Sequence, residues 1–588
     1  MAISQPVIKK IEDNQEALKY FEEISLLQED DKIQEVITSF PTVYIHSWKD
    51  SGDYEVYIGE SNNIFARTRQ HYNVGINDAT SWQREIFDKS ASLYIIGHEH
   101  FNKSMTLDIE NRLMHYMLGI SGVRKVHNLR GNPQNKYYPI EELDNIFSKI
   151  WRKLRRDNKN LFPDESSIRD SAIFKASPLH KLTKDQIAAR DMIIDRVRNA
   201  LRNSQTGQII FIEGEAGTGK TVLNSSTFYE IFCQAEEHGN PNVRCSLIVN
   251  HKEQKAVYEQ IASKLGLTDK YSEVVYRPTR FINTHSPENP VDVAFIDEAH
   301  LLLTQGKQSY KGENQLQDIL NRARVTVVMF DENQILTTEQ FWEAKLLEKY
   351  KKQAKDTQNY IVLKNQMRMH ADQKTLAWID SFTKEGLVQK IPNSSTDYEI
   401  RIFNSPDELD CAIQRKANSS GTSLSRMIAT YDWDYNERAK QTNRVMKYWE
   451  VMIGQWHKPW NRELEQELSN KEKKAIKNLS WAEQPQTIGE VGSTFTIQGF
   501  DLNYAGVILG PSVKYRDGHI VFDPEASRND KAVRNRTLSD GTKKKFGELL
   551  LQHEVRVLMT RGVSGLYIYA CDDELRKVLC QATNKEQI

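Results

Sequence analysis

The spacing of apolar residues changes along the N-terminal part of the chain, and each spacing predicts a different kind of element. Residues 1–38 are charged and carry apolar residues at helical intervals, which predicts one or two amphipathic helices. Two β-branched segments then flank a polar stretch that contains glycine, which predicts a β-hairpin. These segments are Thr42–His46 and Tyr54–Gly59, separated by Lys49–Asp53, and a helix from Ile64, a strand at Leu93–Ile96 and a helix at Leu107–Leu118 are predicted to follow.

Residues 149–180 interrupt this pattern. The stretch from Lys149 to Lys159 is basic and runs into the loop-forming sequence Pro163–Ser167, which predicts a linker. Two interpretations of its basic residues stay open, a solvated helix or a segment that follows a phosphate backbone. These residues are Arg152, Lys153, Arg155 and Arg156.

From about residue 180 onward, short continuous apolar segments alternate with helical ones. Such segments are typical of strands in parallel sheets that helices cover on both faces. The sequence therefore predicts an α/β fold for the rest of the chain. The predicted strands are Ile209–Ile212, Ser246–Val249, Val293–Ile296, Val325–Phe330, Tyr360–Leu363, Met427–Ala429, Gly506–Leu509 and Leu566–Tyr569.

Composition argues against a generally basic protein, a disulfide- or zinc-based framework and a membrane-spanning protein. Lys and Arg (79) balance Asp and Glu (80), so the 588-residue chain has no overall basic coat, although a local basic groove is compatible with this balance. The five cysteines are scattered without a C-x-x-C pair, which argues against a disulfide framework or a zinc cluster. The sequence contains neither a signal peptide nor an apolar run of about 18 residues, so we expect a cytoplasmic protein that does not cross a membrane.

A phosphate-binding loop follows directly after the predicted strand Ile209–Ile212. Glycines in such a loop let backbone N–H groups surround phosphate, and the N-terminus of the next helix adds positive potential. Lys220 would reach the β and γ phosphates of ATP, and Thr221 would supply an oxygen to Mg²⁺. The loop is Gly214-Glu215-Ala216-Gly217-Thr218-Gly219-Lys220-Thr221, which fits the pattern G-x-x-x-x-G-K-[ST].

An acidic pair, Asp297-Glu298, ends the predicted strand Val293–Ile296. Carboxylates at the carboxyl end of a buried parallel strand lie where a nucleotide-bound metal would sit. We therefore assign Asp297 to the Mg²⁺ site and Glu298 to the orientation of the attacking water. Together with the phosphate-binding loop, this pair predicts ATP hydrolysis.

Further short motifs follow one another in an order that resembles superfamily 1 helicases, specifically the Schlafen-type helicase-domain family of bacteria. The resemblance covers residues 180–575 and implies two RecA-like domains, with Gln186 reading adenine and Gln334 coupling the ATP state to the nucleic acid. It also implies that Arg368 and Arg561 point at the γ-phosphate across an interdomain cleft, where they would stabilise transition-state charge. The motifs are Leu182–Gln186, Phe330–Gln334, Leu363–Arg368, Thr496–Asp501 and Met559–Gly562.

The predicted hairpin and the helices after it carry a second set of polar residues. Tyr44 and Tyr57 lie in the two strands, and Arg67 and His71 are four residues apart, so they share one face of the next helix. Glu110 lies among apolar residues of the helix Leu107–Leu118. A carboxylate on an apolar stripe is costly unless it is paired or bound to a metal.

This set resembles the GIY-YIG endonuclease family over residues 40–135. Tyr57-Ile58-Gly59 matches one family signature, whereas Thr42 stands where the other signature has glycine. The resemblance implies that Tyr44 is the general base with Tyr57 as its partner, and that Arg67 and His71 handle the phosphate and a proton. Glu110 would be the sole carboxylate ligand of a catalytic Mg²⁺ or Mn²⁺, and Asn128 is the late asparagine of the site. A tyrosine base needs a lowered pKa, which the metal and Arg67 would supply for Tyr44.

These patterns, together with the two family resemblances, imply five segments. They are an N-terminal helical extension (1–38), a small mixed α/β nuclease domain (39–148), a basic linker (149–180), a RecA-like P-loop domain (181–355) and a second RecA-like domain with a helical insertion (356–588). The leading hypothesis is a metal-dependent nuclease coupled to an ATP-driven helicase or translocase that cleaves foreign DNA in bacterial antiviral defence.

Two alternatives stay open at this point. In one, the ATPase is a non-processive sensor that gates the nuclease, with RNA as a possible substrate in place of DNA. In the other, the nuclease domain is inactive and the protein is a nucleic-acid-binding ATPase. A further class is a nucleic-acid-binding scaffold in which neither activity is intact. We expect nucleic acid as the partner and ATP with Mg²⁺ or Mn²⁺ as cofactors, and the oligomeric state stays open.

Overall fold

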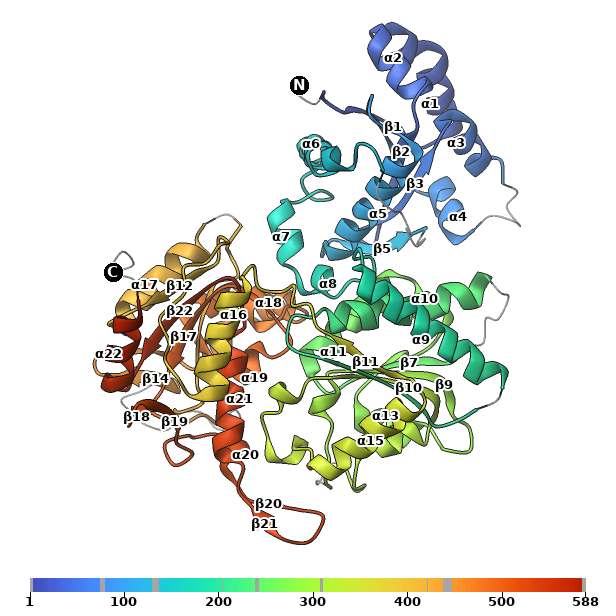
Figure 1. The fold of residues 1–588 in the computed structure, drawn as a ribbon. Coiled ribbons are helices and arrows are strands. Elements are labelled where there is room, and N and C mark those ends of the chain that lie inside the picture. The colour runs from blue at the N-terminus through green and yellow to red at the C-terminus, as the bar shows by residue number, and fades with distance from the viewer. Residues whose placement is uncertain are drawn as a thin grey trace. The chain divides into compact units, whose positions relative to one another are not determined.

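The computed structural model describes residues 4–74, 80–128, 137–203, 205–237, 243–306, 310–419, 421–436 and 447–583. Residues 129–135 of the predicted nuclease region therefore lie outside the described residues. The chain divides into two compact units, which are described separately (Figure 1). Unit 1 comprises Met1–Lys181 with Tyr229–Pro241 and Val257–Val274, and unit 2 comprises Leu182–Phe228, Asn242–Ala256 and Val275–Ile588.

Unit 1 contains a five-stranded mixed sheet with the strand order β1-β4-β2-β3-β5. Its strands are β1 (Val7–Glu12), β2 (Thr42–Asp50), β3 (Asp53–Ser61), β4 (Ala91–Gly97) and β5 (Val123–His127). β2 and β3 form the predicted hairpin, but only Ser51 and Gly52 make the turn, with φ of 52° and 100°. A two-residue turn with positive φ at both positions matches strand twist, so the strands run further than their apolar pattern predicted.

Unit 1 also contains helices, and one of them, at Lys103–Gly119, buries most of its length. They are α1 (Gln15–Tyr20), α2 (Asp31–Thr38), α3 (Ile64–Tyr72), α4 (Ser81–Asp88), α5 (Lys103–Gly119), α6 (Leu143–Asp157), α7 (Glu165–Asp170) and α8 (Ala172–Lys175), with the short α12 (Leu267–Lys270) in a later segment. The side chain of Asn102 caps α5, and Met105, Ile109, Leu113 and Met117 are fully buried along it. This spacing of four residues holds one face of α5 against the sheet.

The N-terminal segment is only partly the helical extension that the sequence predicted. α1 and α2 are helices, but residues 7–12 form β1, which pairs antiparallel with β4 from Val7 opposite Gly97 to Glu12 opposite Ser92. Unpaired backbone groups on β4 favour such an addition, and the helical pattern of the following residues hid it. The extension is therefore an edge strand of the same sheet as the predicted nuclease domain.

The predicted linker is also wrong for residues 149–157, which belong to helix α6. Ile150, Trp151 and Leu154 are almost fully buried, and the Trp151 indole donates to the Pro163 carbonyl at 2.9 Å. A helix that buries such an apolar face is held by tertiary packing. The basic residues between these positions concealed the apolar stripe in the sequence.

Unit 2 begins with a six-stranded sheet in the order β11-β6-β10-β9-β7-β8, in which all neighbours are parallel. The strands are β6 (Gln208–Gly214), β7 (Cys245–Val249), β8 (Val275–Tyr276), β9 (Val291–Asp297), β10 (Ala323–Phe330) and β11 (Tyr360–Leu363). The helices are α9 (Lys184–Arg202), α10 (Lys220–Glu237), α11 (Lys252–Lys264), α13 (Pro278–Thr284), α14 (Gln315–Leu320) and α15 (Ala344–Asp356). Phe281, Leu316 and Leu347 of the last three pack against Phe211 and Phe330 in one core.

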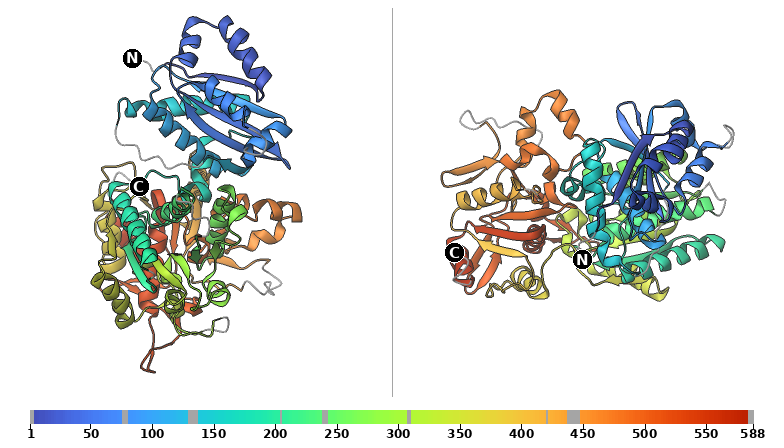
Figure 2. Two further views of the ribbon diagram at one scale, coloured as in Figure 1. Left: turned by 90° about the vertical axis from the view of Figure 1, so that its right-hand side faces the viewer. Right: turned by 90° about the horizontal axis from the view of Figure 1, so that it is seen from above.

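A second parallel sheet follows, in the order β12-β22-β17-β13-β16. The strands are β12 (Glu399–Ile402), β13 (Arg426–Ala429), β16 (Val491–Gly492), β17 (Leu502–Leu509) and β22 (Gly562–Ala570). The helices are α16 (Gln373–Asp380), α17 (Pro406–Ala417), α19 (Thr494–Ile497), α20 (Asp530–Val533), α21 (Gly547–Met559) and α22 (Asp573–Ala582). Helices accompany both parallel sheets in the turned views of Figure 2. The α/β fold with parallel sheets is thus confirmed.

Two details of the second half differ from the prediction. β11 belongs to the first parallel sheet, where it pairs with β6, so the boundary predicted after residue 355 falls too early by at least this strand. The predicted helical insertion contains a hairpin, β14 (Glu450–Ile453) and β15 (Trp456–Pro459), besides helix α18 (Asn470–Ile476). Two more hairpins are β18 (Val513–Arg516) with β19 (His519–Phe522) and β20 (Arg536–Thr537) with β21 (Lys543–Lys544).

None of the helices within the described residues is both long enough and apolar enough to span a bilayer.

Candidate active sites

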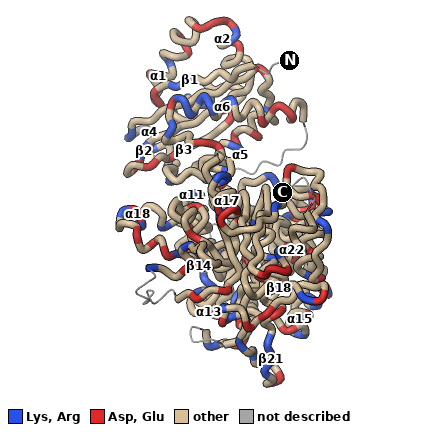
Figure 3. The backbone as a smooth tube through the Cα atoms, turned by 90° about the vertical axis from the view of Figure 1, so that its left-hand side faces the viewer, with Lys and Arg blue, Asp and Glu red and all other residues tan. Residues whose placement is uncertain are grey.

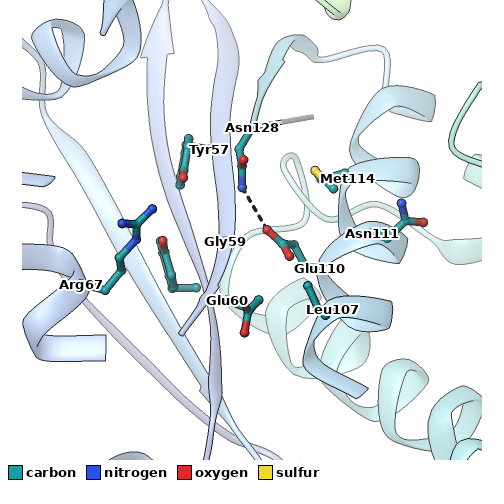
Figure 4. Close-up of a pocket in the computed structure, with 10 residues that line it drawn as sticks. Tyr57, Gly59, Glu60, Arg67, Leu107, Glu110, Asn111, Met114 and Asn128 are labelled. Atoms are coloured by element: carbon teal, nitrogen blue, oxygen red, sulfur yellow. Dashed lines mark hydrogen bonds between the residues drawn. The ribbon is translucent and has the colours of Figure 1, made fainter. Parts of the chain in front are cut away.

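A polar pocket of about 90 Å³ lies in unit 1, between the β2–β3 hairpin, α3 and α5 (Figure 4). It gathers five of the six residues that the sequence assigned to the nuclease site, namely Tyr44, Tyr57, Arg67, Glu110 and Asn128. The sixth, His71, lies directly behind Tyr44, whose hydroxyl is 3.1 Å from His71 Nε2. The remaining lining residues are Gly59, Glu60, Leu107, Asn111 and Met114.

The tyrosines approach each other because of a glycine. Tyr44 pairs with Gly59 in the hairpin register, and a β-carbon at Gly59 would overlap the Tyr44 hydroxyl. The rings of Tyr44 and Tyr57 stack with centroids 6.2 Å apart. The side chain of Asn63 caps α3 by accepting from Ala66 N. Arg67 and His71 of this helix both interact with Tyr44.

Burial controls the protonation states in this pocket. It raises the pKa of Tyr44 far above its usual range, with a further rise from Tyr57, and Arg67 only partly offsets this. Arg67 alone therefore does not lower the Tyr44 pKa, because desolvation of the phenolate outweighs the nearby guanidinium, and the expected lowering depends on the metal. Burial, together with His46 and Arg67, lowers the pKa of His71 to about 3, so this imidazole is neutral at pH 7.

Glu110 is held in the pocket by Asn128. The Asn128 amide donates to Glu110 Oε1 at 2.9 Å and to the Ile58 carbonyl at 2.6 Å, and thereby ties α5 to β3. Asn128 has a φ of 62°, a left-handed conformation that asparagine adopts more readily than most residues. The dashed line in Figure 4 marks the bond to Glu110.

The donor set around Glu110 suits a hard divalent cation. Carboxylate oxygens are the ligands that Mg²⁺ and Mn²⁺ prefer, and Mg²⁺ commonly uses one or two of them with water and phosphate oxygens. The described residues contain no group of three or more His, Cys, Asp or Glu side chains placed to hold a metal. Two carboxylates line the pocket. Glu110 is oriented by the amide of Asn128, whereas Glu60 pairs with the cation Lys103 and accepts from Thr106. Because the Lys103 ammonium would compete with a metal cation for Glu60, the cation is assigned to Glu110.

Sequence reasoning missed a buried layer behind the tyrosines. His46 Nδ1 lies 2.6 Å from the Asp13 carboxylate, which also accepts from the Tyr72 hydroxyl at 2.5 Å. The His46 ring contacts both Tyr44 and Tyr57 edge-on, at 5.4 and 5.8 Å between centroids. His46 lies two residues after Tyr44 on one face of β2, and this alternation was the signal available in the sequence.

The phosphate-binding loop of unit 2 connects β6 to α10. Lys220 is buried, and its ammonium donates to the carbonyls of Gly214 and Glu215 at 2.6 and 2.9 Å. Gly217 and Gly219 have φ of 85° and 77°, and a β-carbon at either would overlap neighbouring side chains. This backbone can therefore pass close to a phosphate only with glycine at both positions.

The acidic pair at the end of β9 lies beside this loop. The Thr221 hydroxyl is 3.3 Å from Asp297 Oδ2, which also accepts from Gln254 Nε2 at 2.8 Å. These oxygens fit the hard cation that accompanies a nucleotide. Glu298 has a φ of 50°, and its carboxylate lies 3.4 Å from His300 Nε2. Burial lowers the pKa of His300.

The two predicted arginine fingers lie close to this site but bind protein acceptors. Arg561 is fully buried and donates to Gln334 Oε1 at 2.8 Å and to the Phe500 carbonyl at 3.2 Å. Burial, with the charge of Arg368, lowers the pKa of Arg561 to about 10, so it stays a cation at pH 7. Arg368 pairs with Asp501 at 2.7 Å.

Two further residues that the sequence assigned to nucleotide binding, Gln186 and Glu215, contact other groups of the protein. Gln186 accepts from Thr183 N at 2.9 Å and caps α9, while its amide lies 3.4 Å from the Gly219 carbonyl. The Glu215 carboxylate accepts from Arg556 and Lys384 at 2.8 and 2.9 Å. Sequence reasoning missed Arg556, Lys384 and Gln254, because nothing local marks them as neighbours of the loop.

Comparison with known proteins concerns mainly unit 2. The family model "Schlafen group 3, DNA/RNA helicase domain" matches residues 207–572. The chain is 32% identical over 440 residues to the uncharacterised protein YPL245W of Saccharomyces cerevisiae (strain ATCC 204508 / S288c), which covers 69% of this chain and 91% of that protein.

Among solved structures, the chain is similar to the Pif1 helicase from Candida albicans (TM-score 0.27, 12% identity, 68% of this chain and 97% of that one). It is also similar to a DEAD box protein from the hyperthermophile Methanococcus jannaschii (TM-score 0.26, 15% identity, 68% and 94% of the chains). The family match, which spans more than half of the chain, agrees with the strand–loop–helix site of unit 2. The chain belongs to the Schlafen group 3 family of proteins with a DNA/RNA helicase domain.

Proposed function

We propose that this protein couples a metal-dependent nuclease in unit 1 to an ATP-driven nucleic-acid motor in unit 2. The observation that carries the nuclease half is the convergence of Tyr44, Tyr57, Arg67, Glu110 and Asn128 on one pocket from three separate parts of the chain. The motor half rests on the family membership and on the phosphate-binding loop with Thr221 and Asp297 beside it. DNA is the favoured substrate, and a role in bacterial antiviral defence follows from the resemblance alone.

In the nuclease half, Tyr44 and His71 act as a proton-accepting pair. Tyr44 takes a proton from the attacking water only if its own phenolic proton leaves, and His71 Nε2, 3.1 Å away and neutral, accepts it. The high pKa of Tyr44 and the low pKa of His71 both oppose this transfer in the free protein. The negative charge of a bound phosphodiester favours the imidazolium, so the transfer is coupled to substrate binding.

The other pocket residues handle charge and position. Arg67 lies beside both tyrosines, where its guanidinium would bind the phosphodiester and offset charge that grows on it in the transition state. Glu110, oriented by Asn128, would hold a divalent cation. Such a cation, when bound, would polarise the phosphodiester and favour the ionised form of Tyr44.

In the motor half, the chain would hold ATP through the loop that contains Lys220. Thr221 and Asp297 would bind the accompanying cation, and Glu298 would orient the attacking water. Arg561 and Arg368 would have to exchange Gln334 and Asp501 for the γ-phosphate, which makes hydrolysis depend on a rearrangement of the cleft. The contact of Arg561 with Gln334 would link that rearrangement to the nucleic acid.

The test combines two variants of the full chain with labelled plasmid, linear DNA and RNA, Mg²⁺ or Mn²⁺, and ATP. Glu110→Ala is expected to abolish cleavage, because it removes the carboxylate that would hold the cation in unit 1. It should leave ATP turnover intact, because the ATP site lies in unit 2. Lys220→Ala is expected to abolish ATP turnover. A folded Glu110→Ala protein that cuts as well as the parent would refute the nuclease assignment.

The same experiment separates the alternatives. Cleavage that needs ATP without strand displacement would favour a non-processive ATPase that gates the nuclease, and preference for labelled RNA would change the substrate. Cleavage unaffected by Lys220→Ala would mean that the two activities are only tethered. ATP turnover stimulated by nucleic acid, with no cleavage under any condition, would indicate an inactive nuclease domain that binds nucleic acid.

A further inference from the structure

Helix α6 of unit 1 has two opposite faces of different chemistry. Its apolar face consists of Leu143, Ile146, Phe147, Ile150, Trp151 and Leu154, all buried. The other face, which we call the basic stripe, consists of Lys149, Arg152, Lys153 and Arg156. These four residues follow the spacing i, i+3, i+4, i+7, so they lie along one side of the helix. Figure 3 shows the run of blue positions on α6.

The orientation of the basic stripe is fixed by packing of the apolar face. Phe147 and Trp151 contact the ring of Tyr116 on α5 edge-on, at 4.8 and 5.0 Å between centroids. Trp151 also contacts Phe162 and donates to the Pro163 carbonyl. α6 is therefore anchored on α5, the helix that carries Glu110, and this packing fixes the side of α6 on which the exposed Arg152 and Arg156 lie.

The stripe consists of two partly buried lysines and two exposed arginines. Lys149 and Lys153 donate to the carbonyls of Ser4 and Pro6, at 3.5 and 2.7 Å. Arg152 and Arg156 are exposed, and no carboxylate pairs with either of them in the described part of the chain. The acidic residues that lie nearby have other partners, since Asp144 pairs with Arg112 and Asp157 with Lys10. Burial and repulsion from Arg156 and Lys9 lower the pKa of Lys153. An anion on this surface would relieve that repulsion.

We propose that the basic stripe of α6 is a docking surface for the phosphate backbone of nucleic acid, which it holds on the unit that cuts it. The inference rests on the proposed nuclease function. Arginine and lysine along one side of a helix can contact the phosphates of a nucleic-acid backbone without reading bases. The chain has a net charge of −1, so this stripe is a local excess of positive charge rather than part of a general one.

The test measures how the affinity of the full chain for a labelled DNA duplex depends on salt. All proteins carry Glu110→Ala to prevent cleavage, ATP is left out, and Kd is measured between about 50 and 200 mM salt. The double variant Arg152→Gln/Arg156→Gln should reduce the slope of log Kd against log salt by about 2, since each lost phosphate contact contributes about 0.9. Both side chains are exposed, so the melting temperature should not change.

A charge-retaining variant is the matched control. Arg152→Lys/Arg156→Lys keeps both cations and should keep the parental slope, because a phosphate is also bound by a point charge. An unchanged slope in the Gln variant would overturn the proposal. Loss of binding to vesicles containing phosphatidylserine, with the slope for DNA unchanged, would assign the stripe to a membrane surface and would overturn it as well.

These outcomes can be told apart from failure of the nuclease. If the unmodified chain, with Glu110 in place, does not cut but the Gln variant loses slope, the docking surface stands and the cleavage assignment fails. If the parent cuts and the slope is unchanged, the nuclease stands and the docking surface fails.

Discussion

At the scale of single residues, the pocket of unit 1 depends both on a glycine, which has no side chain, and on the aromatic rings around it. Gly59 leaves room for the Tyr44 hydroxyl, and the Tyr57 ring is held from its other side by Trp82, stacked at 3.9 Å between centroids. The tyrosine pair is therefore confined on several sides. Such confinement fixes the distance from Tyr44 to His71, on which the proposed proton transfer depends.

Gly59→Ala is expected to displace Tyr44 and to reduce cleavage strongly. Overpacking of this kind costs about 1–3 kcal/mol of unfolding free energy, so the melting temperature should fall too. Gly122→Ala is the matched control, because nothing lies within 4 Å of a β-carbon at that position. Both proteins are compared in plasmid cleavage and in thermal unfolding. Cleavage by Gly59→Ala at the parental rate would contradict this account of the pocket.

Arg561→Ala is expected to act on ATP hydrolysis more than on ATP binding. Its charge is needed as negative charge grows in the transition state, so turnover should fall at least about a hundredfold. Arg516→Ala is the control, because Arg516 is an exposed arginine that pairs with Asp572. Steady-state turnover at saturating ATP and nucleotide affinity are measured separately. Weaker affinity with unchanged turnover would argue against a role in the transition state.

At the scale of elements, β1 places a buried acid behind the tyrosine pair of unit 1. Asp13 follows β1 directly, and pairing of β1 with β4 sets its carboxylate against His46 and Tyr72. His46 in turn contacts both tyrosines. The N-terminal segment thus supports the pocket, although none of its residues lines it.

Asp13→Asn should destabilise unit 1 and weaken cleavage. An amide offers one acceptor oxygen where the carboxylate offers two, so one buried donor loses its partner, at a cost of about 1–3 kcal/mol. Tyr72→Phe removes only the hydrogen bond from the Tyr72 hydroxyl to Asp13 and leaves no unpaired donor. It should therefore lower the free energy of unfolding by less than Asp13→Asn does. The measurements are urea unfolding and cleavage rate. If Tyr72→Phe proved more damaging than Asp13→Asn, the carboxylate would not be the centre of this network.

At the scale of the whole molecule, unit 1 contains several histidines whose environment opposes protonation. Burial lowers the pKa of His71, His98, His115 and His180 below the ordinary value of 6.5. The unfolded chain therefore binds protons at these positions at a higher pH than the folded one. By linkage, stability is complete above about pH 6.5 and decreases as the pH falls below it.

Unit 1 should therefore lose stability between about pH 6.5 and 5, before most carboxylates titrate, by up to about 1.4 kcal/mol per pH unit for each histidine. Hydrogen exchange of α5 amides, corrected for intrinsic rates, measures this in the full chain. His115→Leu should reduce the pH dependence of stability, because it removes one titrating group. Leucine keeps an apolar side chain against Phe174, whose ring lies 3.7 Å from that of His115 between centroids. Stability that rises on acidification would contradict the prediction.

The sequence by itself determined the features that depend on neighbouring residues. The phosphate-binding loop needs glycines at Gly217 and Gly219 for its backbone conformation, so its pattern can be read locally. The apolar segments of the two parallel sheets and the β2–β3 hairpin were predicted for the same reason, since strand periodicity and turn residues are local properties. The roles of Tyr44, Tyr57, Arg67, His71, Glu110 and Asn128 came from a family resemblance rather than from local physics, and they stay predictions.

Only the tertiary structure decided which groups meet across long sequence separations. The addition of β1 to the sheet, the Asp13–His46 contact and the orientation of α6 depend on partners that no local pattern specifies. The same holds for Arg561, whose acceptor Gln334 lies 227 positions away. Burial, too, exists only in the folded chain, and it raises the pKa of Tyr44 because desolvation of the phenolate outweighs the single nearby cation, Arg67.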